Sequence, residues 1–174
     1  DREADCSVAL NAMREGTLPL RVTHNDTKLN NVLMDEETRQ GICIIDLDTV
    51  MPGLVIYDFG DSIRFGANHS AEDEKDLSKV NLDVDLFAVY TAAFLEGAGG
   101  SLTNEEIDYL PWGAKLMTLE CGIRFLTDYL DGDHYFHISR EAQNLDRCRT
   151  QFKLAADMED RWAELEAIVR QYRK

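Results

Sequence analysis

Apolar residues recur every three or four positions at the start of the chain and through most of its second half, a spacing typical of amphipathic helices. Cys6, Ala9, Leu10 and Met13 share one face of a first helix that Gly16 can end. Thr103 and Glu106 have the spacing of a capping box. Later helices are predicted at Val84 to Glu96, at Thr103 to Tyr129 with a break near Pro111, and at Ala142 to Tyr172.

Between residues 18 and 45 the pattern changes to short apolar runs. Strands are predicted at Leu18 to Val22, Asn31 to Met34 and Ile42 to Ile45, with a polar turn over Asp35 to Gln40 between the last two. After Met51–Pro52–Gly53 the chain should be helical to its end. Residues 1–174 are therefore expected to form one α+β domain, mainly helical, with a small β-hairpin region and not a doubly wound sheet.

The charge balance limits the partners. The net charge is −15, from 33 acidic and 18 basic residues, which disfavours nucleic acid and anionic membranes as partners. No apolar run approaches the roughly 20 residues that cross a bilayer, and the first residues lack the form of a secretion signal. The four cysteines contain no C-x-x-C pair, which disfavours a zinc site or a disulfide framework. We expect a cytoplasmic protein with reduced thiols.

One segment carries chemistry. Residues 24–31 read His-Asn-Asp-Thr-Lys-Leu-Asn-Asn and fit H-x-D-x-x-x-x-N, the spacing of a kinase catalytic loop. Phosphoryl transfer requires a carboxylate that accepts the proton of the attacking hydroxyl, which suits Asp26. Asn31 can supply an oxygen ligand for Mg²⁺ that adds no negative charge beside the triphosphate of ATP. Lys28 can reach the γ-phosphate, and His24 is interpreted as an organiser of the loop.

A second carboxylate fits the same chemistry. Asp46 lies 15 positions after Asn31 and ends the run Ile42 to Ile45, which we expect to be a buried strand that presents the Mg²⁺-binding Asp rigidly. Asp48 is a candidate second metal contact. Asp58–Phe59–Gly60 spells the D-F-G of protein kinases but follows no apolar strand. Asp58 is instead expected to be structural, accepting hydrogen bonds from backbone amides of the catalytic loop.

These motifs resemble the aminoglycoside phosphotransferase and choline kinase family, and most closely its bacterial N-acetylhexosamine 1-kinases. The likeness covers nearly the whole chain and rests on four stretches: residues 24–33, 45–53, 57–61 and 144–150. It implies the C-terminal lobe of a kinase-like fold. It also implies transfer of the γ-phosphoryl group of ATP to the anomeric hydroxyl of N-acetylglucosamine or N-acetylgalactosamine, in cytoplasmic amino-sugar salvage.

The chain departs from this family in one respect. A kinase N-lobe provides a Gly-rich loop and a lysine for the phosphates of ATP, and the 23 residues before His24 leave no room for one. Gly97–Ala98–Gly99–Gly100 has neither the G-x-G-x-x-G spacing nor that of a P-loop. We therefore expect a C-lobe that needs its own N-lobe as a partner and has little or no activity alone.

Acceptor contacts are less defined by the sequence. On the helix after Pro111, one face is predicted to be a core stripe, formed by Leu116, Leu119, Ile123, Leu126 and Leu130, and another face is charged. Glu120 and Arg124 either form a surface ion pair at helical spacing or line the acceptor cleft, where such side chains bind sugar hydroxyls. The candidate acceptor contacts are Asn25, Arg64, Glu120, Arg124, Arg147 and Arg149.

Three alternatives remain at this stage. The acceptor can be choline, which needs an aromatic cage, or an aminoglycoside, which needs clustered carboxylates. Asp46-Leu47-Asp48-Thr49-Val50 also fits a haloacid dehalogenase-type phosphatase, with Asp46 as nucleophile and Asp48 as acid/base. Lastly, the chain can be a module that binds a partner without catalysis.

Overall fold

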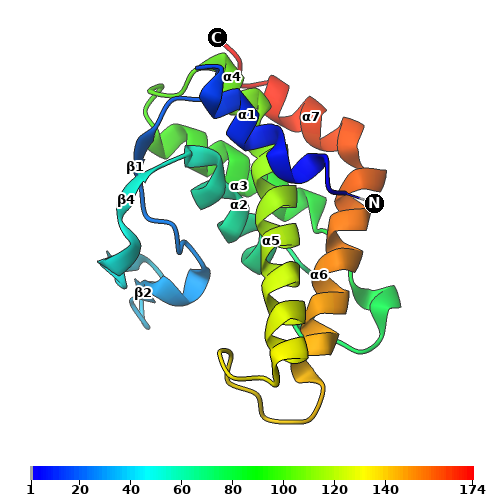
Figure 1. The fold of residues 1–174 in the computed structure, drawn as a ribbon. Helices are drawn as coiled ribbons and strands as arrows, with labels where there is room; N and C mark the ends of the chain where they lie inside the picture. Colours follow the sequence, from blue (N-terminus) through cyan, green and yellow to red (C-terminus); the bar gives the residue numbers. More distant parts are fainter. Residues whose placement is uncertain (1) are drawn as a thin grey trace.

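The computed structural model describes residues 2–174, and helices make up most of that range (Figure 1). The α-helices in it are α1 (Val8–Arg14), α2 (Val55–Gly66), α3 (Val84–Gly97), α4 (Asn104–Asp108), α5 (Leu110–Asp131), α6 (Gln143–Asp160) and α7 (Trp162–Arg170). Short 3-10 turns lie at Asp5–Ser7, Leu29–Asn31, Leu47–Thr49 and Leu77–Lys79. The predicted α+β, mainly helical fold class is confirmed.

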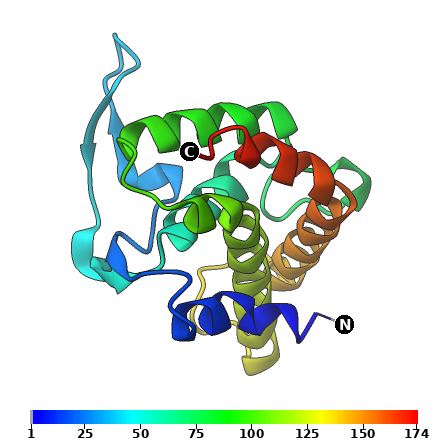
Figure 2. The same ribbon diagram turned by 90° about the horizontal axis from the view of Figure 1, so that it is seen from above.

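The strands of the described residues form two separate antiparallel pairs. β1 (Arg21–Thr23) pairs with β4 (Met51–Gly53), and β2 (Val32–Met34) pairs with β3 (Gly41–Ile44). Figure 1 shows the strands together on one side of the helices, and Figure 2 shows the β2–β3 hairpin projecting away from the helical body. The strand pairs therefore place the loop between β1 and β2 at the edge of the helical body.

The main core lies where α2 crosses α5. Phe59 of α2 is fully buried and packs edge-on against Phe87 and Phe94 of α3, with ring centroids 5.6 and 5.3 Å apart. At the crossing itself, a Cβ atom on Gly60 would lie 2.2 Å from the carbonyl oxygen of Gly113. The two helix backbones can approach this closely only because both positions lack a side chain.

Several predicted boundaries agree with the structure. The helix at Val84, the capping box of Thr103 and Glu106, and the break before Pro111 are all present. The strand β4 was not predicted, and the last predicted helix is divided at Arg161 into α6 and α7. A three-residue strand is too short for an alternating pattern to reveal it.

Two predictions about burial are wrong. The run Ile42 to Ile45 does not form a buried strand, because Ile42 is 65% and Ile44 59% exposed on a two-stranded ribbon. On α5, the predicted core stripe is correct for Leu116 and Leu119, which are buried, and wrong for Ile123 (46% exposed) and Leu130 (75% exposed). The α5 residues that pack towards α6 are instead Cys121, Gly122 and Phe125.

Within residues 2–174, no helix combines the length and the apolar character that crossing a bilayer requires.

Candidate active site

The predicted catalytic loop, residues 24–31, is tied to the first turn of α2 by Asp58. The Asp58 carboxylate accepts the backbone N–H of His24 at 2.8 Å and that of Asn25 at 2.7 Å. The backbone carbonyl of Asp58 also accepts the hydroxyl of Thr27 at 2.5 Å. The predicted structural role of Asp58 is confirmed, and its neighbours Phe59 and Gly60 serve the core.

Asp26 lies in the middle of this loop with its carboxylate held by two donors. Lys28 Nζ and Asn31 Nδ2 each donate to Asp26 Oδ2 at 2.8 Å. Partial burial raises the pKa of Asp26, but the hydrogen bonds from Lys28 and Asn31 outweigh it, so the pKa lies below the usual Asp value. The carboxylate is therefore ionised at neutral pH and able to accept a proton.

His24 connects the loop to Ile45, the residue that follows strand β3. Its Nδ1 atom accepts the backbone N–H of Asp26 at 3.3 Å, and its Nε2 atom lies 3.1 Å from the carbonyl oxygen of Ile45. Because Nδ1 is an acceptor, the ring proton is on Nε2, which donates to Ile45. The ring therefore fixes Asp26 relative to the residue that precedes Asp46.

Asn25 has a left-handed backbone, with φ of +63°, a conformation that Asn tolerates better than most residues. Its Oδ1 atom accepts the Thr23 hydroxyl at 3.0 Å, and its Nδ2 donates to the carbonyl of Thr49 at 2.9 Å. The same Thr23 hydroxyl lies against Gly53, where a Cβ atom would be 2.4 Å from Thr23 Oγ1 and would therefore not fit. The Asn25 amide is thus engaged in holding the loop, although the residue also borders the cavity described below.

Three oxygen-bearing side chains, those of Asn31, Asp46 and Asp48, are the predicted ligands of a cation. Asn31 donates Nδ2 to both the carbonyl and the carboxylate of Asp26, which leaves its Oδ1 atom as a ligand. Ile45 N–H donates to the Asn31 carbonyl at 2.9 Å, so Asp46 directly follows the residue that is hydrogen-bonded to Asn31. Asp46 and Asp48 are exposed, and neither carboxylate has a hydrogen bond or ion pair within residues 2–174.

These donors suit one class of metal. In the described part of the chain, no three His, Cys, Asp or Glu side chains cluster closely enough to bind an ion by themselves. An amide oxygen and one or two carboxylates are instead the partial set that Mg²⁺ uses when phosphate and water complete its coordination. The residues present therefore fit Mg²⁺ bound together with a nucleotide.

A cavity of about 530 Å³ opens beside Asp26 and Lys28. One face of α5 and one face of α2 form its walls. The wall residues are Met117, Glu120, Cys121, Arg124 and Phe125 from α5, and Asp61, Arg64 and Phe65 from α2. Burial raises the pKa of the Cys121 thiol to about 12, so Cys121 is a neutral part of the wall.

The loop between α5 and α6 also borders the cavity. Its residues Tyr135, Phe136 and His137 line the cavity. The buried Asp128 holds this loop, because its carboxylate accepts the backbone N–H groups of Tyr135 and Phe136 at 2.8 and 2.9 Å. Burial raises the pKa of Asp128, but these hydrogen bonds outweigh it and the pKa is lowered.

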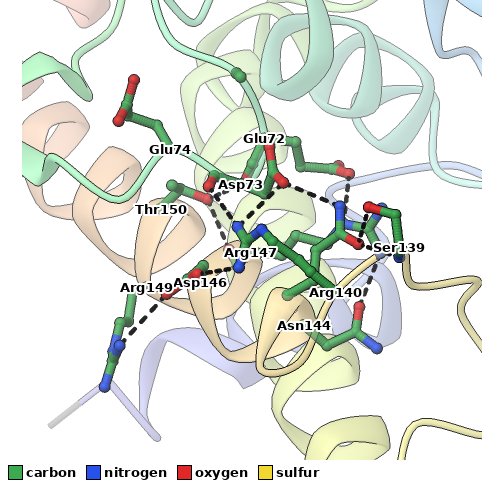
Figure 3. A network of polar contacts seen from close by, with 12 residues as sticks. Glu72, Asp73, Glu74, Ser139, Arg140, Asn144, Asp146, Arg147, Arg149 and Thr150 are labelled. Atoms are coloured by element: carbon green, nitrogen blue, oxygen red, sulfur yellow. Dashed lines mark hydrogen bonds and ion pairs between the residues drawn. The ribbon is translucent and has the colours of Figure 1, made fainter.

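Figure 3 shows the polar network at the start of α6. Arg140 pairs with Asp146 at 2.6 Å and with Asp73 at 3.2 Å. Arg147 Nε lies 3.6 Å from Glu72 Oε2, and both residues line the cavity. The network therefore joins the segment after α2 to the cavity wall.

One protein family matches the first half of the chain. Residues 2–91 match the phosphotransferase enzyme family, APH. The chain belongs to this family. The match contains the loop of Asp26 and Asn31 together with Asp46 and α2, and membership indicates phosphate transfer as the general chemistry. The resemblance to aminoglycoside phosphotransferases and choline kinases is confirmed at the level of this APH family.

The structure divides the candidate site residues of this APH-family chain into two groups. Those that line the cavity are Asn25, Asp26, Lys28, Arg64, Glu120, Arg124 and Arg147. Those that lie outside its lining are His24, Asn31, Asp46, Asp48 and Arg149. Arg149 is 57% exposed and lies at the edge of the network in Figure 3, where its guanidinium contacts only Asp146 among the residues drawn, at 3.4 Å.

Sequence reasoning missed two charged residues of the cavity. Asp61 is buried and pairs with Arg64 at 2.9 Å, and Glu72 pairs with the same guanidinium at 3.1 Å. The spacing of Asp61, Arg64 and Phe65 on one helical face was a usable signal. Glu72 lies in a charged segment whose pattern predicts no element.

Proposed function

We propose that this chain is the catalytic C-terminal lobe of a kinase that transfers the γ-phosphoryl group of ATP to a hydroxyl of a small molecule. The observation that carries the proposal is the position of Asp26. Its ionised carboxylate is oriented by Lys28 and Asn31 and borders a cavity of about 530 Å³ that can hold an acceptor. Family membership supports phosphate transfer over the phosphate hydrolysis considered for Asp46 and Asp48.

In this proposal each residue of the loop has one role. Asp26 orients the acceptor hydroxyl and takes its proton as the oxygen attacks the γ-phosphate. Lys28, beside Asp26, offsets negative charge on the transferred group. His24 keeps Asp26 at a fixed place relative to Ile45, and through it relative to Asp46.

The same proposal assigns the metal ligands. Asn31 and Asp46 hold Mg²⁺, and Asp48 is a second contact reached directly or through water. When bound, Mg²⁺ supplies positive charge that neutralises the phosphate oxygens.

We further propose that the acceptor is the anomeric hydroxyl of N-acetylglucosamine or N-acetylgalactosamine, in cytoplasmic amino-sugar salvage. The resemblance over residues 24–33 and 45–53 supports this acceptor. The cavity is consistent with it, because its charged side chains can bind hydroxyls and its aromatic rings can pack on a sugar face.

A separate N-lobe completes the enzyme in this proposal. The described residues contain only two-stranded sheets, and the surface around the catalytic loop exposes large apolar side chains. These include Val22 (83%), Ile42 (65%) and Leu47 (59%), which an N-lobe and a nucleotide would cover. Without that lobe the chain lacks a second clamp for the phosphates, so we expect little or no turnover by the chain alone.

The test is ADP release from Mg·ATP with N-acetylglucosamine. It compares the 174-residue chain, the complete gene product with its N-lobe, and the Asp26→Asn variant of the complete product. Turnover by the complete wild type alone is the expected result. No turnover with any hexosamine would overturn the sugar assignment, and choline and aminoglycosides would then be tested as acceptors. Phosphate release without ATP would instead support a phosphatase, and a function that survives Asp26→Asn would support a binding module.

A further inference from the structure

The cavity is electrically balanced, although the chain is strongly acidic. The net charge of the chain is −15. Equal numbers of acidic and basic side chains line the cavity. The four carboxylates are those of Asp26, Asp61, Glu72 and Glu120, and the four cations are Lys28, Arg64, Arg124 and Arg147. A polycationic acceptor requires surplus carboxylates, and this cavity has none.

The carboxylates of the cavity are also already paired. Asp26 contacts Lys28 at 2.8 Å and Asp61 contacts Arg64 at 2.9 Å. Glu120 lies 3.6 Å from Arg124 across one turn of α5. An entering ammonium group would have to break one of these pairs and leave a lysine or an arginine unpaired inside the cavity.

The aromatic rings offer a cation no better site. The Arg124 guanidinium lies 5.4 Å from the ring centre of Tyr135 and 5.3 Å from that of Phe136. The Arg147 guanidinium lies 5.4 Å from the ring centre of Phe125. Four Phe and Tyr rings line the cavity, and Phe65 is the one without such a contact. The other three already have a cation at the position that a quaternary ammonium would take.

We propose that Arg124 is a specificity-determining residue that excludes cationic acceptors, so that the cavity accepts an uncharged, hydroxyl-bearing molecule. This inference rests on the proposed function, because it assigns an acceptor class to the same cavity. Arg124 acts by repulsion and by occupying the Tyr135 and Phe136 rings, and such repulsive elements are a common source of specificity. A free amine and a quaternary ammonium are both rejected by this arrangement.

Arg124 suits a test by substitution better than Arg147, because it holds fewer parts of the fold together. Arg147 donates to the His137 carbonyl at 3.1 Å and to Asn144 Oδ1 at 2.9 Å, and so holds the loop and α6 together. The Arg124 side chain is 47% exposed, and its contacts are the hydroxyl of Tyr135 at 3.2 Å, the two rings and Glu120.

The test measures binding of tetramethylammonium to the 174-residue chain by NMR titration of its backbone amides. Wild type, Arg124→Gln, Arg124→Lys and Arg149→Gln are compared. Arg124→Gln removes the cation and uncovers the two rings, so its affinity for tetramethylammonium should rise about tenfold. Arg124→Lys keeps a positive charge and should show no gain. Arg149→Gln removes an equal charge outside the cavity and is the matched control.

A gain restricted to Arg124→Gln, with shifts at Tyr135 and Phe136, supports the inference. The inference is overturned if Arg124→Gln shows no increase in affinity for tetramethylammonium, or if Arg149→Gln shows an equal increase. A parallel titration with N-acetylglucosamine separates the two proposals. If that sugar fails to bind while Arg124→Gln binds tetramethylammonium more tightly than the wild type does, the proposed amino-sugar acceptor is wrong and the proposed role of Arg124 stands.

Discussion

The carboxylate of Asp58 accepts the backbone N–H of Asn25 at 2.7 Å, across 33 positions of sequence. The same carboxylate accepts the N–H of His24, so one side chain on α2 fixes the start of the predicted catalytic loop. Asn25 has a left-handed backbone, and this tether helps to hold it there. The geometry of Asp26 thus depends on a residue that does not contact the cavity.

Replacing Asp58 with Asn should loosen the loop. An amide oxygen can accept one of the two N–H groups, but the amide nitrogen faces the other with no acceptor to offer. We expect a loss of about 2 kcal/mol in the free energy of unfolding, measured by urea denaturation. Hydrogen exchange at His24 and Asn25 should become faster. Asp48→Asn, at an exposed carboxylate without contacts, should leave both measurements unchanged, and an equal response of the two variants would contradict the tether.

The crossing of α2 and α5 gives a second prediction. A Cβ atom on Gly113 would lie 2.0 Å from the carbonyl oxygen of Ile56, so Gly113→Ala must push the helices apart. Overpacking of this kind costs about 2–3 kcal/mol and should lower the melting temperature by about 4–12 °C. Gly66→Ala is the control, because nothing lies within 4 Å of a Cβ atom there and its φ is not left-handed. A Gly113→Ala protein that melts with the wild type would show that the crossing is not as close as described.

The sequence predicted the local features of the site better than its surroundings. Residues 24–31 and Asp46 could be proposed as site residues from sequence, because phosphoryl transfer requires particular residue types at fixed spacing. The cavity was found only in part, because its walls come from α2, α5 and the loop before α6, which approach one another only in the folded chain. The exposure of Ile42 and Ile44 could not be read from their apolar character, since burial depends on what covers a strand.

The N-terminal segment is anchored by an ion-pair cluster that should respond to pH. Glu159 accepts hydrogen bonds from Arg2 at 2.7 Å and lies 2.8 Å from Lys115 Nζ. The hydrogen bond from Arg2, together with that from Lys115, lowers the pKa of Glu159 from 4.5 to about 2, against the opposing effect of burial.

Because the folded pKa of Glu159 is below the unfolded value, its contribution to stability is present above about pH 5 and is lost as the pH falls towards 2. Glu159 is about one-third exposed, which reduces the contribution to about 1–2 kcal/mol. Urea denaturation from pH 7 to pH 2 should show this loss in the wild type and a flatter profile in Glu159→Gln. Glu164→Gln, at a 55% exposed side chain, should retain the wild-type profile. Parallel profiles for wild type and Glu159→Gln would contradict the anchor.

The β2–β3 hairpin should make the isolated chain associate. Ile42 and Ile44 lie on the exposed face of a ribbon with two open edges, a combination that favours pairing with another chain. Replacing both with Thr keeps the β-branched shape that suits a strand and removes the apolar surface. We expect the wild-type chain to bind a hydrophobic dye and to elute above its monomer size, and the double variant to do less of both. Val89→Thr, at a 66% exposed residue on α3, is the control and should behave as the wild type. If a longer protein that carries the proposed N-lobe neither associates nor binds the dye, the result supports the proposal that this lobe covers the hairpin. If the 174-residue wild-type chain is already monomeric and dye-free, the hairpin is not an interaction surface.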